Sequence, residues 1–358
     1  MRIGIATDSR GNRSHKQGTA MTFDPDAAAS GEGIFGLPTT PGEARIVLVP
    51  VPFDATTSYR GGTSHGPAAI RRASAQVDLY DLSFGRIYER GIHMLDEDEG
   101  IAELSHNARR LAAPIIERGG ATPQDVKHVA DIDSACSQVN VKVHRTATGI
   151  LREGKIPGVV GGEHAVSFGA ILACAEHHPG LAVLQIDAHM DLRDRYEGLK
   201  WSHASVLRNV MDEIKGVSKL VQVGIRDFAE GEKRYAEKHA GRITTFYDDE
   251  VFAEAARGLH FGIVCDRILA ELPEHIYITL DIDGLEPSLC PHTGTPVPGG
   301  MSFREAAMLL HRVASSGRRV VGFDLVEVCP GPGAGDSAPD WDANVGARIL
   351  YKLCGAAQ

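Results

Sequence analysis

Short apolar runs that alternate with helical segments constrain the fold of this chain more than any other feature. The apolar runs lie at residues 45–50, 157–162, 182–186, 220–225, 243–247, 275–280 and 319–328. Helical patterns lie at residues 67–74, 135–153, 166–178, 202–215, 229–240, 263–271, 302–315 and 343–353. Strands buried on both faces have such continuous apolar sequences, and intervening helices permit parallel pairing. We therefore expect an α/β fold whose mostly parallel central sheet is covered by helices on both faces.

The chain has 358 residues and shows neither a linker nor an internal repeat, so we expect one catalytic domain over residues 43–358. Residues 1–42 are expected to form an N-terminal tail or extension. The first twenty residues are basic and lack the apolar stretch of a secretory signal, which favours a loose tail or an upstream start ahead of Met21. The acidic, irregular stretch 85–131 is expected to form an excursion or an oligomer contact.

Composition excludes several classes of partner. The formal net charge is −10 and no basic stripe stands out, so we expect no nucleic-acid surface. No apolar run reaches the roughly 18 residues of a membrane span, so we expect no membrane partner. The six cysteines are scattered, without a CxxC pair, which favours free thiols in a reducing compartment. These features together predict a cytoplasmic enzyme.

Two acidic segments directly follow predicted strands, and they carry most of the chemical information. In an extended chain alternate side chains share a face, so Asp187, His189 and Asp191 can point together, as can Asp281 and Asp283. Carboxylates that converge in this way repel one another unless cations neutralise them. Oxygen ligands with a minority of nitrogen suit Mn²⁺, Fe²⁺, Co²⁺ or Ni²⁺, and the number of anionic ligands suggests two ions. We interpret this set as a binuclear metal site that activates water for hydrolysis.

Other polar residues follow strands in the same way. Gly161-Gly162-Glu163-His164 ends the run at 157–162, and Glu327 ends the run at 319–328. Ligands bind at the carboxyl ends of strands in open parallel sheets, so these segments are expected to meet at one edge. Alternatively, each aspartate could only cap the helix that follows it. That explanation accounts for a single segment, but not for all of these segments together. A GxxxxGK match at 149–155 is rejected as a phosphate-binding loop because Ile156 stands where Ser or Thr must reach Mg²⁺.

The motifs GGEH, DAHMD, SHASV, DIDGLEPS, GTPVPGG and LVEV, in this order, closely resemble those of the arginase/agmatinase family of ureohydrolases. The resemblance covers most of residues 46–353. It implies an arginase-like three-layer αβα sandwich and two divalent metal ions per chain, Mn²⁺ or Ni²⁺. It also implies hydrolysis of a small guanidino substrate to urea and an amine. Relatives usually form homo-oligomers, trimers or hexamers, and a related subunit is a further possible partner.

The resemblance also assigns roles to residues. It implies that one metal is held by His164, Asp187, Asp191 and Asp281, and the other by Asp187, His189, Asp281 and Asp283. Asp191 would also orient the hydroxide that forms between the ions, His203 would carry a proton to the leaving amine, and Glu327 would clamp the guanidinium. Thr295 would place a hydroxyl near the substrate.

Departures from the family pattern bear on the substrate. Glu163 stands where the family often has Asp, and His292 stands where relatives have a small residue, so that it either narrows the pocket or lies on the loop surface. The arginase loop that grips an α-amino acid is not recognisable after residues 224–227. Residues 55–67 and 73–79 look more like the branch that acts on guanidine and small alkylguanidines, which we take as the expected substrates, a biguanide included.

Alternatives remain open within and outside this class. Agmatine and guanidino acids are alternative substrates. A non-catalytic assembly subunit of a ureohydrolase would keep the fold without the activity, although it would have no need for costly buried carboxylates. A histone-deacetylase-like amidohydrolase would share the sheet but use a single Zn²⁺ and fewer carboxylates. Counting the metal ions per chain separates these readings.

Overall fold

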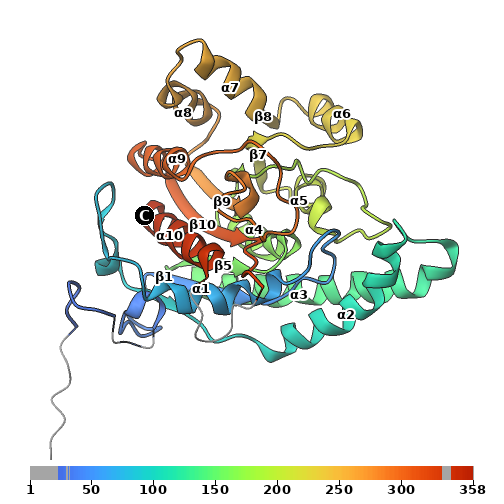
Figure 1. Cartoon of the computed structure of the whole chain (residues 1–358), viewed down its shortest axis with the longest axis horizontal. Helices are drawn as coiled ribbons and strands as arrows, with labels where there is room; N and C mark the ends of the chain where they lie inside the picture. Colours follow the sequence, from blue (N-terminus) through green and yellow to red (C-terminus); the bar gives the residue numbers. More distant parts are fainter. Residues whose placement is uncertain (1–22, 30, 32, 333–339, 358) are drawn as a thin grey trace, which may run out of the picture.

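The computed structural model describes residues 23–29, 31, 33–332 and 340–357, and an eight-stranded sheet forms its centre (Figure 1). In spatial order the strands are β4 (Ile92–Met94), β1 (Ile46–Val51), β5 (Ile156–Gly161), β10 (Arg319–Val326), β9 (His275–Asp281), β6 (Leu181–Ile186), β7 (Val217–Ile225) and β8 (Ile243–Tyr247). Every neighbouring pair in this sheet is parallel. A small antiparallel hairpin joins β2 (Tyr80–Asp81) to β3 (Gly85–Arg86). The α/β prediction is thus confirmed.

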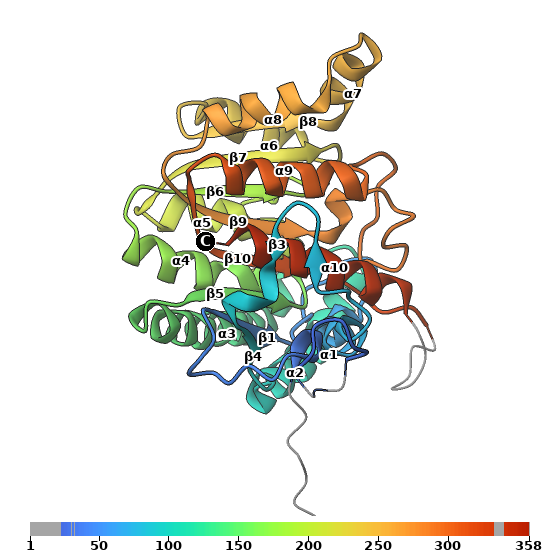
Figure 2. The same cartoon turned by 90° about the vertical axis from the view of Figure 1, so that its left-hand side faces the viewer.

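Helices pack in series on the two faces of this sheet, which completes the three-layer sandwich (Figure 2). One series consists of α1 (Gly66–Ser74), α10 (Trp341–Ala356), α9 (Phe303–Ser315), α8 (Phe261–Ala270) and α7 (Asp248–Ala256). The other consists of α2 (Glu99–Glu117), α3 (Val126–Arg152), α4 (Ser167–His177) and α5 (Val206–Glu213), with α6 (Glu230–Lys238) against β8. Short 3-10 turns lie at Ile34–Gly36, Thr63–His65, Ile87–Arg90, Pro123–Asp125, His164–Val166, His203–Ser205 and Ile282–Gly284. None of these helices is both long and apolar enough to cross a bilayer.

The apolar strands are explained by burial on both faces. Along β6, Leu181 and Val183 belong to one hydrophobic cluster, whereas Ala182, Leu184 and Ile186 belong to the other, and all five are fully buried. Side chains alternate between faces along a strand, so a sheet with two covered faces favours apolar residues at successive positions. The same reason accounts for the uninterrupted apolar runs in the sequence.

The connections create a crevice at the centre of the sheet. After β5 the chain adds β6, β7 and β8 outward, and it then returns to insert β9 and β10 between β5 and β6. The chain therefore changes direction between the adjacent strands β6 and β9. Such a switch point is where open parallel sheets bind ligands, outside the carboxyl ends of the strands.

The stretch 85–131, which we could not assign, contains regular structure. It holds β4, α2 and the first turns of α3, and the prediction also missed α7. The start of α2 is capped by Asp98, whose side chain accepts a hydrogen bond from the backbone N–H of Gly100 at 2.8 Å. Before residue 43, Phe35 is buried and its ring lies 4.8 Å from that of Tyr351, so part of the predicted extension packs on the domain. Residues 1–22 lie outside the described ranges, and the single-domain boundary stays a prediction.

Candidate metal centre and active site

Three polar side chains follow the carboxyl end of β6. Asp187 is fully buried, and its carboxylate accepts hydrogen bonds from the Gln185 side chain at 2.8 Å and from the backbone N–H of His189 at 2.6 Å. Asp191 has a φ of 53°, a conformation that non-glycine residues rarely adopt. Backbone outliers of this kind cluster at functional sites, and this turn brings the Asp191 carboxylate to within 2.9 Å of the His164 ring.

His164 reaches the same place from the end of β5. Its Nδ1 lies 2.9 Å from Asp191 Oδ2, 3.1 Å from Asp187 Oδ2 and 3.5 Å from Asp281 Oδ2. Asp281 is the last residue of β9, so three strands contribute to one cluster of facing side chains. The strand-end placement predicted from the sequence brings these residues together.

A second group of facing side chains shares Asp187 with the first. His189 Nδ1 lies 3.1 Å from Asp283 Oδ2 and 3.6 Å from Asp187 Oδ1. Two sets of three ligand atoms, each set within 4.8 Å, are formed by His164, Asp187 and Asp191 and by Asp187, His189 and Asp283. The shared position of Asp187 agrees with its predicted role as a bridging ligand. The complete ligand set stays a prediction.

The hydrogen bonds of His164 prepare one ring nitrogen for a cation. Its Nε2 lies 2.8 Å from the hydroxyl of Thr279, which donates its own hydrogen to Asp324 at 2.7 Å. The Thr279 oxygen can therefore only accept from Nε2–H, so in the neutral ring Nδ1 is the nitrogen that carries the lone pair. Nδ1 is buried and has no hydrogen-bond partner. A hydrogen bond to the nitrogen that does not bind the ion fixes the tautomer of metal-binding histidines.

The electrostatics of the cluster require positive charge. Burial alone would lower the pKa of His164, but Asp187, Asp191 and Asp281 outweigh it and raise that pKa well above its usual range. Burial likewise opposes the shift of His189, yet Asp283 and Asp187 raise its pKa to about 12.

The carboxylates respond to the same crowding. Burial, followed by the charges of Asp283 and Asp187, raises the pKa of Asp281 well above its usual range. Burial and the charge of Asp187 raise the pKa of Asp191 to about 7. Two protonated histidines would supply only half of the charge needed by the four carboxylates, whereas two divalent cations match it. The residues present therefore fit a pair of divalent metal ions with oxygen and nitrogen ligands.

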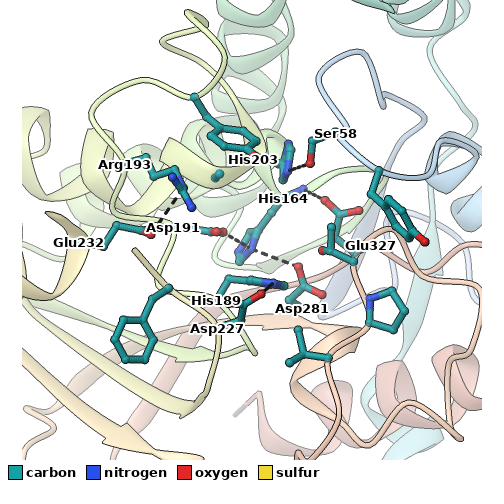
Figure 3. A pocket seen from close by; sticks show the side chains of 17 residues that line it. Ser58, His164, His189, Asp191, Arg193, His203, Asp227, Glu232, Asp281 and Glu327 are labelled. Carbon is teal, nitrogen blue, oxygen red and sulfur yellow. Dashed lines mark hydrogen bonds and ion pairs between the residues drawn. The ribbon is translucent and has the colours of Figure 1, made fainter. Parts of the chain in front are cut away.

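A cavity of about 310 Å³ opens beside the cluster (Figure 3). Predicted site residues that line it are His164, His189, Asp191, His203, Asp281, Thr295 and Glu327. Residues to which the sequence assigned no individual role also line it, namely Ser58, Tyr59, Arg193, Tyr196, Ala204, Asp227, Phe228, Glu232, Pro296 and Val297. The Thr295 hydroxyl donates to Asp283 Oδ2 at 3.3 Å, which places it between the carboxylate cluster and the cavity wall.

Glu327 presents a carboxylate to this cavity from the end of β10. It has a φ of 62°, its backbone N–H donates to Gly162 at 2.7 Å, and its Oε1 accepts from the backbone N–H of His164 at 2.8 Å. Burial, then the charges of Asp281 and Glu163, raise the pKa of Glu327 well above its usual range. A cation that entered the cavity beside Glu327 would reverse this shift and favour the ionised form.

His203 also lines the cavity, from the 3-10 turn that precedes α5 (Figure 3). Its Nε2 is 3.3 Å from the hydroxyl of Ser58, and its ring centroid is 6.0 Å from that of Tyr196. Burial and the charge of His189 lower the pKa of His203 to about 3. The imidazole is therefore neutral near pH 7.

The structure does not bring His292 into this cavity. Its ring Nδ1 lies 2.9 Å from a carboxylate oxygen of Asp342, which is buried at the start of α10, and its backbone N–H bonds to the same side chain. These two contacts hold His292 against a separate groove that also contains Arg60 and Pro330. Of the two placements expected from the sequence, His292 therefore takes the one on the loop surface and not the one that contacts the substrate and narrows the pocket.

Some residues that shape the site could have been found from strand alternation. Thr279 and Gln185 each precede a cluster aspartate by two positions, so they point to the same face of the sheet. Asp227 and Arg193 come from loops and Glu232 comes from the first turn of α6, and no local pattern marks them as site residues.

Comparisons with known proteins agree on one family. The model of the Arginase family matches residues 44–355. The N(1)-aminopropylagmatine ureohydrolase of Thermus thermophilus is 32% identical over 299 residues, which cover 83% of this chain and 87% of that protein. The agmatinase of Bacillus anthracis is 31% identical over 301 residues, with 83% and 88% covered. The solved structure of proclavaminate amidino hydrolase from Streptomyces clavuligerus is similar with a TM-score of 0.69 and 26% identity, covering 92% of this chain and 97% of that one.

Proposed function

The chain belongs to the arginase family, and on that premise we propose that it is a metal-dependent ureohydrolase of linear guanidino amines such as agmatine. Members of this family hydrolyse a C–N bond of a guanidino group. The observation that supports this proposal most directly is the cavity itself. It has the carboxylate and histidine cluster and Glu327 on its inner side, and an exposed carboxylate, Asp227, at its rim.

Glu327 is placed to recognise the guanidinium group. One of its oxygens is held by the backbone N–H of His164, and the other is left to accept an N–H from the substrate. Guanidinium and carboxylate form charge-assisted hydrogen bonds that also fix orientation. We propose that Glu327 holds the guanidinium so that its central carbon faces Asp191 and the rest of the cluster.

His164, Asp187, His189, Asp191, Asp281 and Asp283 would hold two divalent ions, either Mn²⁺ or Ni²⁺. When bound, such ions lower the pKa of a coordinated water and polarise the group under attack. Asp191 would orient and accept the proton of the attacking water, because its carboxylate lines the cavity. Neutral His203 would take up a proton and deliver it to the nitrogen that leaves, which is general acid–base work suited to an imidazole.

The rim of the cavity favours a substrate with a second positive charge. The Asp227 side chain is 69% exposed and lies 3.9 Å from His189 Nε2. Arg193, the cationic residue at the rim, is engaged by Glu232 at 3.5 Å and by the ring of Tyr196 at 4.7 Å. Asp227 can thus attract a distal ammonium, and the carboxylate of a guanidino acid would be repelled there.

Our sequence-based preference for guanidine or a small alkylguanidine rested first on the likeness of residues 55–67 and 73–79 to that branch. Two further arguments supported it. One was that His292 obstructs longer substrates, and the other was that nothing is placed to grip a distant amine. His292 lies outside the cavity and Asp227 lies at its rim, so neither argument stands. Relatives named for agmatine and N(1)-aminopropylagmatine also support the longer substrates.

A urea-release assay tests this proposal, with agmatine, N(1)-aminopropylagmatine, 4-guanidinobutyrate, arginine, guanidine and methylguanidine after separate loading with Mn²⁺ and Ni²⁺. We expect kcat/KM for agmatine to exceed that for guanidine by at least roughly tenfold, about 1.4 kcal/mol of binding. Asp227→Asn should raise KM for agmatine while leaving guanidine unchanged. Asp194→Asn is the control, because Asp194 is exposed in the loop after β6 but does not line the cavity. A kcat/KM for guanidine that exceeds the value for agmatine tenfold would instead support the prediction of a small substrate.

We further propose that the chain works as a homo-oligomer, a trimer or hexamer. Two large apolar side chains that such contacts could cover are Leu82, 94% exposed in the β2–β3 hairpin, and Phe252, 74% exposed on α7. Light scattering during size-exclusion chromatography would measure the number of chains, and a monomer would contradict the proposal.

A further inference from the structure

Thr56 connects a buried carboxylate to His203, although neither Thr56 nor that carboxylate lines the cavity. The carboxylate belongs to Glu163, which is fully buried. One of its oxygens accepts the backbone N–H of Thr56 at 2.7 Å, and the other accepts the Thr56 hydroxyl at 2.9 Å. This two-point contact holds the loop that follows β1 against the end of β5.

The close approach of these two segments is built into the backbone. A Cβ at Gly162 would lie 2.0 Å from the carbonyl oxygen of Phe53, so only glycine allows the contact. The backbone N–H of Glu163 then donates to the same Phe53 carbonyl at 2.8 Å. Glu163 is therefore a rigid anchor for Thr56.

The Thr56 hydroxyl also contacts His203. Its oxygen accepts the backbone N–H of His203 at 3.1 Å and lies 3.5 Å from Nδ1 of the ring. The hydroxyl hydrogen is directed to Glu163, so the oxygen presents lone pairs to His203. The Ser202 hydroxyl lies 3.4 Å from the same Nδ1, whereas the Ser58 hydroxyl lies 3.3 Å from Nε2 at the cavity.

We propose that Thr56, anchored by Glu163, is a positioning residue that holds His203 with Nδ1 protonated and Nε2 free to accept a proton in the cavity. Acceptor oxygen next to Nδ1 favours the tautomer with hydrogen on that nitrogen, and the other nitrogen then carries the lone pair. The Ser58 hydroxyl at the cavity can donate to it. This inference rests on the proposed function, in which His203 transfers a proton.

Thr56→Val removes the hydroxyl and keeps the shape of the side chain, whereas Thr56→Ser keeps the hydroxyl. For Thr56→Val we expect a loss of kcat of roughly 10- to 100-fold, because misplacing a catalytic group by about 1 Å has effects of that size. KM and the metal content should stay close to those of wild type. Thr56→Ser should retain kcat to within about threefold.

Thr57→Val is the matched control. Thr57 is also buried, and its hydroxyl bonds to the carbonyl of Asp54 and to Arg109 instead of to His203. The Thr57→Val variant should lower the melting temperature to a similar degree as Thr56→Val, but without the loss of kcat. If Thr57→Val loses as much kcat, or if Thr56→Ser loses as much as Thr56→Val, loop packing and not the hydroxyl is responsible and the inference is wrong.

His203→Ala separates this inference from the proposed function on which it rests. If Thr56 acts through His203, Thr56→Val should add no further loss in the His203→Ala background. An additive loss there would overturn the role of Thr56 and leave that of His203 intact. Near-normal turnover of His203→Ala would overturn the role of His203 itself. Should Thr56→Val fail to fold, Thr56→Ala provides the same comparison with Thr56→Ser.

Discussion

The neighbouring strands β6 and β9 carry opposite charge environments at their two ends. At their carboxyl ends lie Asp187 and Asp281, which meet His164 and His189 in the candidate metal centre. At their amino ends lie His178 and His275, whose rings stack with centroids 4.7 Å apart. The two strands are paired in parallel along their length, so the same backbone frame serves both ends.

Histidines respond to these two ends in opposite directions. At the carboxyl ends, Asp283 and Asp187 overcome burial and raise the pKa of His189 to about 12. At the amino ends, burial and the charges of His275, His177 and Arg319 lower the pKa of His178 to about 4. The fold brings titratable groups together at both ends, and the sign of the neighbouring charges decides which form is favoured. Only the carboxyl ends are built to attract cations.

The largest effect should come from Asp187→Asn, which removes the carboxylate shared by both ligand groups. We expect activity to fall below detection and elemental analysis to find fewer than the roughly two ions per chain of wild type. A ligand at a hundredfold excess over its Kd stabilises the fold by about 2.7 kcal/mol. The variant should therefore melt earlier than wild type in saturating Mn²⁺. Wild-type protein with one ion or none would contradict the binuclear centre.

Glu327→Gln tests whether a carboxylate at this end also binds the substrate. The amide oxygen can still accept from His164, so both metals should remain bound. Losing charge-assisted hydrogen bonds of about 1.5–3 kcal/mol should lower kcat/KM by roughly 10- to 100-fold. Glu271→Gln is the control, because Glu271 pairs with Lys219 near the amino end of the sheet. Equal losses in both variants would contradict the assignment of Glu327.

The cluster at the carboxyl ends could be predicted because its information is local. Asp187 and Asp281 each follow an apolar strand, and the alternation of side chains places His189 and Asp283 beside them. Parallel strands then bring their carboxyl ends to one edge. His292 shows the limit of this reasoning. It lies three residues from Thr295 in sequence, but the buried Asp342, far along the chain, holds it outside the cavity.

The stretch 85–131 could not be predicted because its partners are distant. The side chain of Asp133, two residues beyond this stretch in α3, accepts the backbone N–H groups of Lys200 and Trp201 at 3.0 and 3.2 Å. The N–H of Ala121 donates to the carbonyl of Glu197 at 2.9 Å. These contacts support the loop before His203, but no periodic pattern in the sequence reveals them. The part of the chain around residues 85–131, which has no readable motif, thus supports the loop before His203, which lies among the clearest motifs.

Gly158→Ala tests the packing of the central sheet, to which both ends of β6 and β9 belong. Gly158 lies in β5, where a Cβ would approach Phe323 to 2.5 Å and Leu48 to 2.7 Å. Overpacking of this kind typically costs about 1–3 kcal/mol. We expect chemical denaturation to show this loss in the free energy of unfolding across the pH range. Gly149→Ala is the control, because nothing lies within 4 Å of its Cβ in α3, and alanine there should stabilise by roughly 1 kcal/mol.

The smallest effect should come from His178→Gln, measured as the thermal midpoint between pH 8 and pH 4 with wild type under the same metal conditions. Above pH 6.5 His178 is neutral in both the folded and the unfolded chain, so it contributes nothing to the pH dependence. As the pH falls below 6.5 the unfolded chain takes up a proton first, because the folded pKa is only about 4. Wild type should therefore lose stability from pH 6.5 down to about 4 relative to the variant.

The neighbours of His178 should set the width of that pH window. His275→Gln removes the stacked ring but leaves His177, whose centroid lies 5.3 Å from that of His178, and Arg319. Less charge then opposes protonation, so the folded pKa should rise and the loss of stability should end at a higher pH than in wild type. Parallel curves for wild type and both variants would show that the histidines at the amino ends do not influence one another. The difference between the two ends of β6 and β9 would then come from the metal-binding cluster at the carboxyl ends alone.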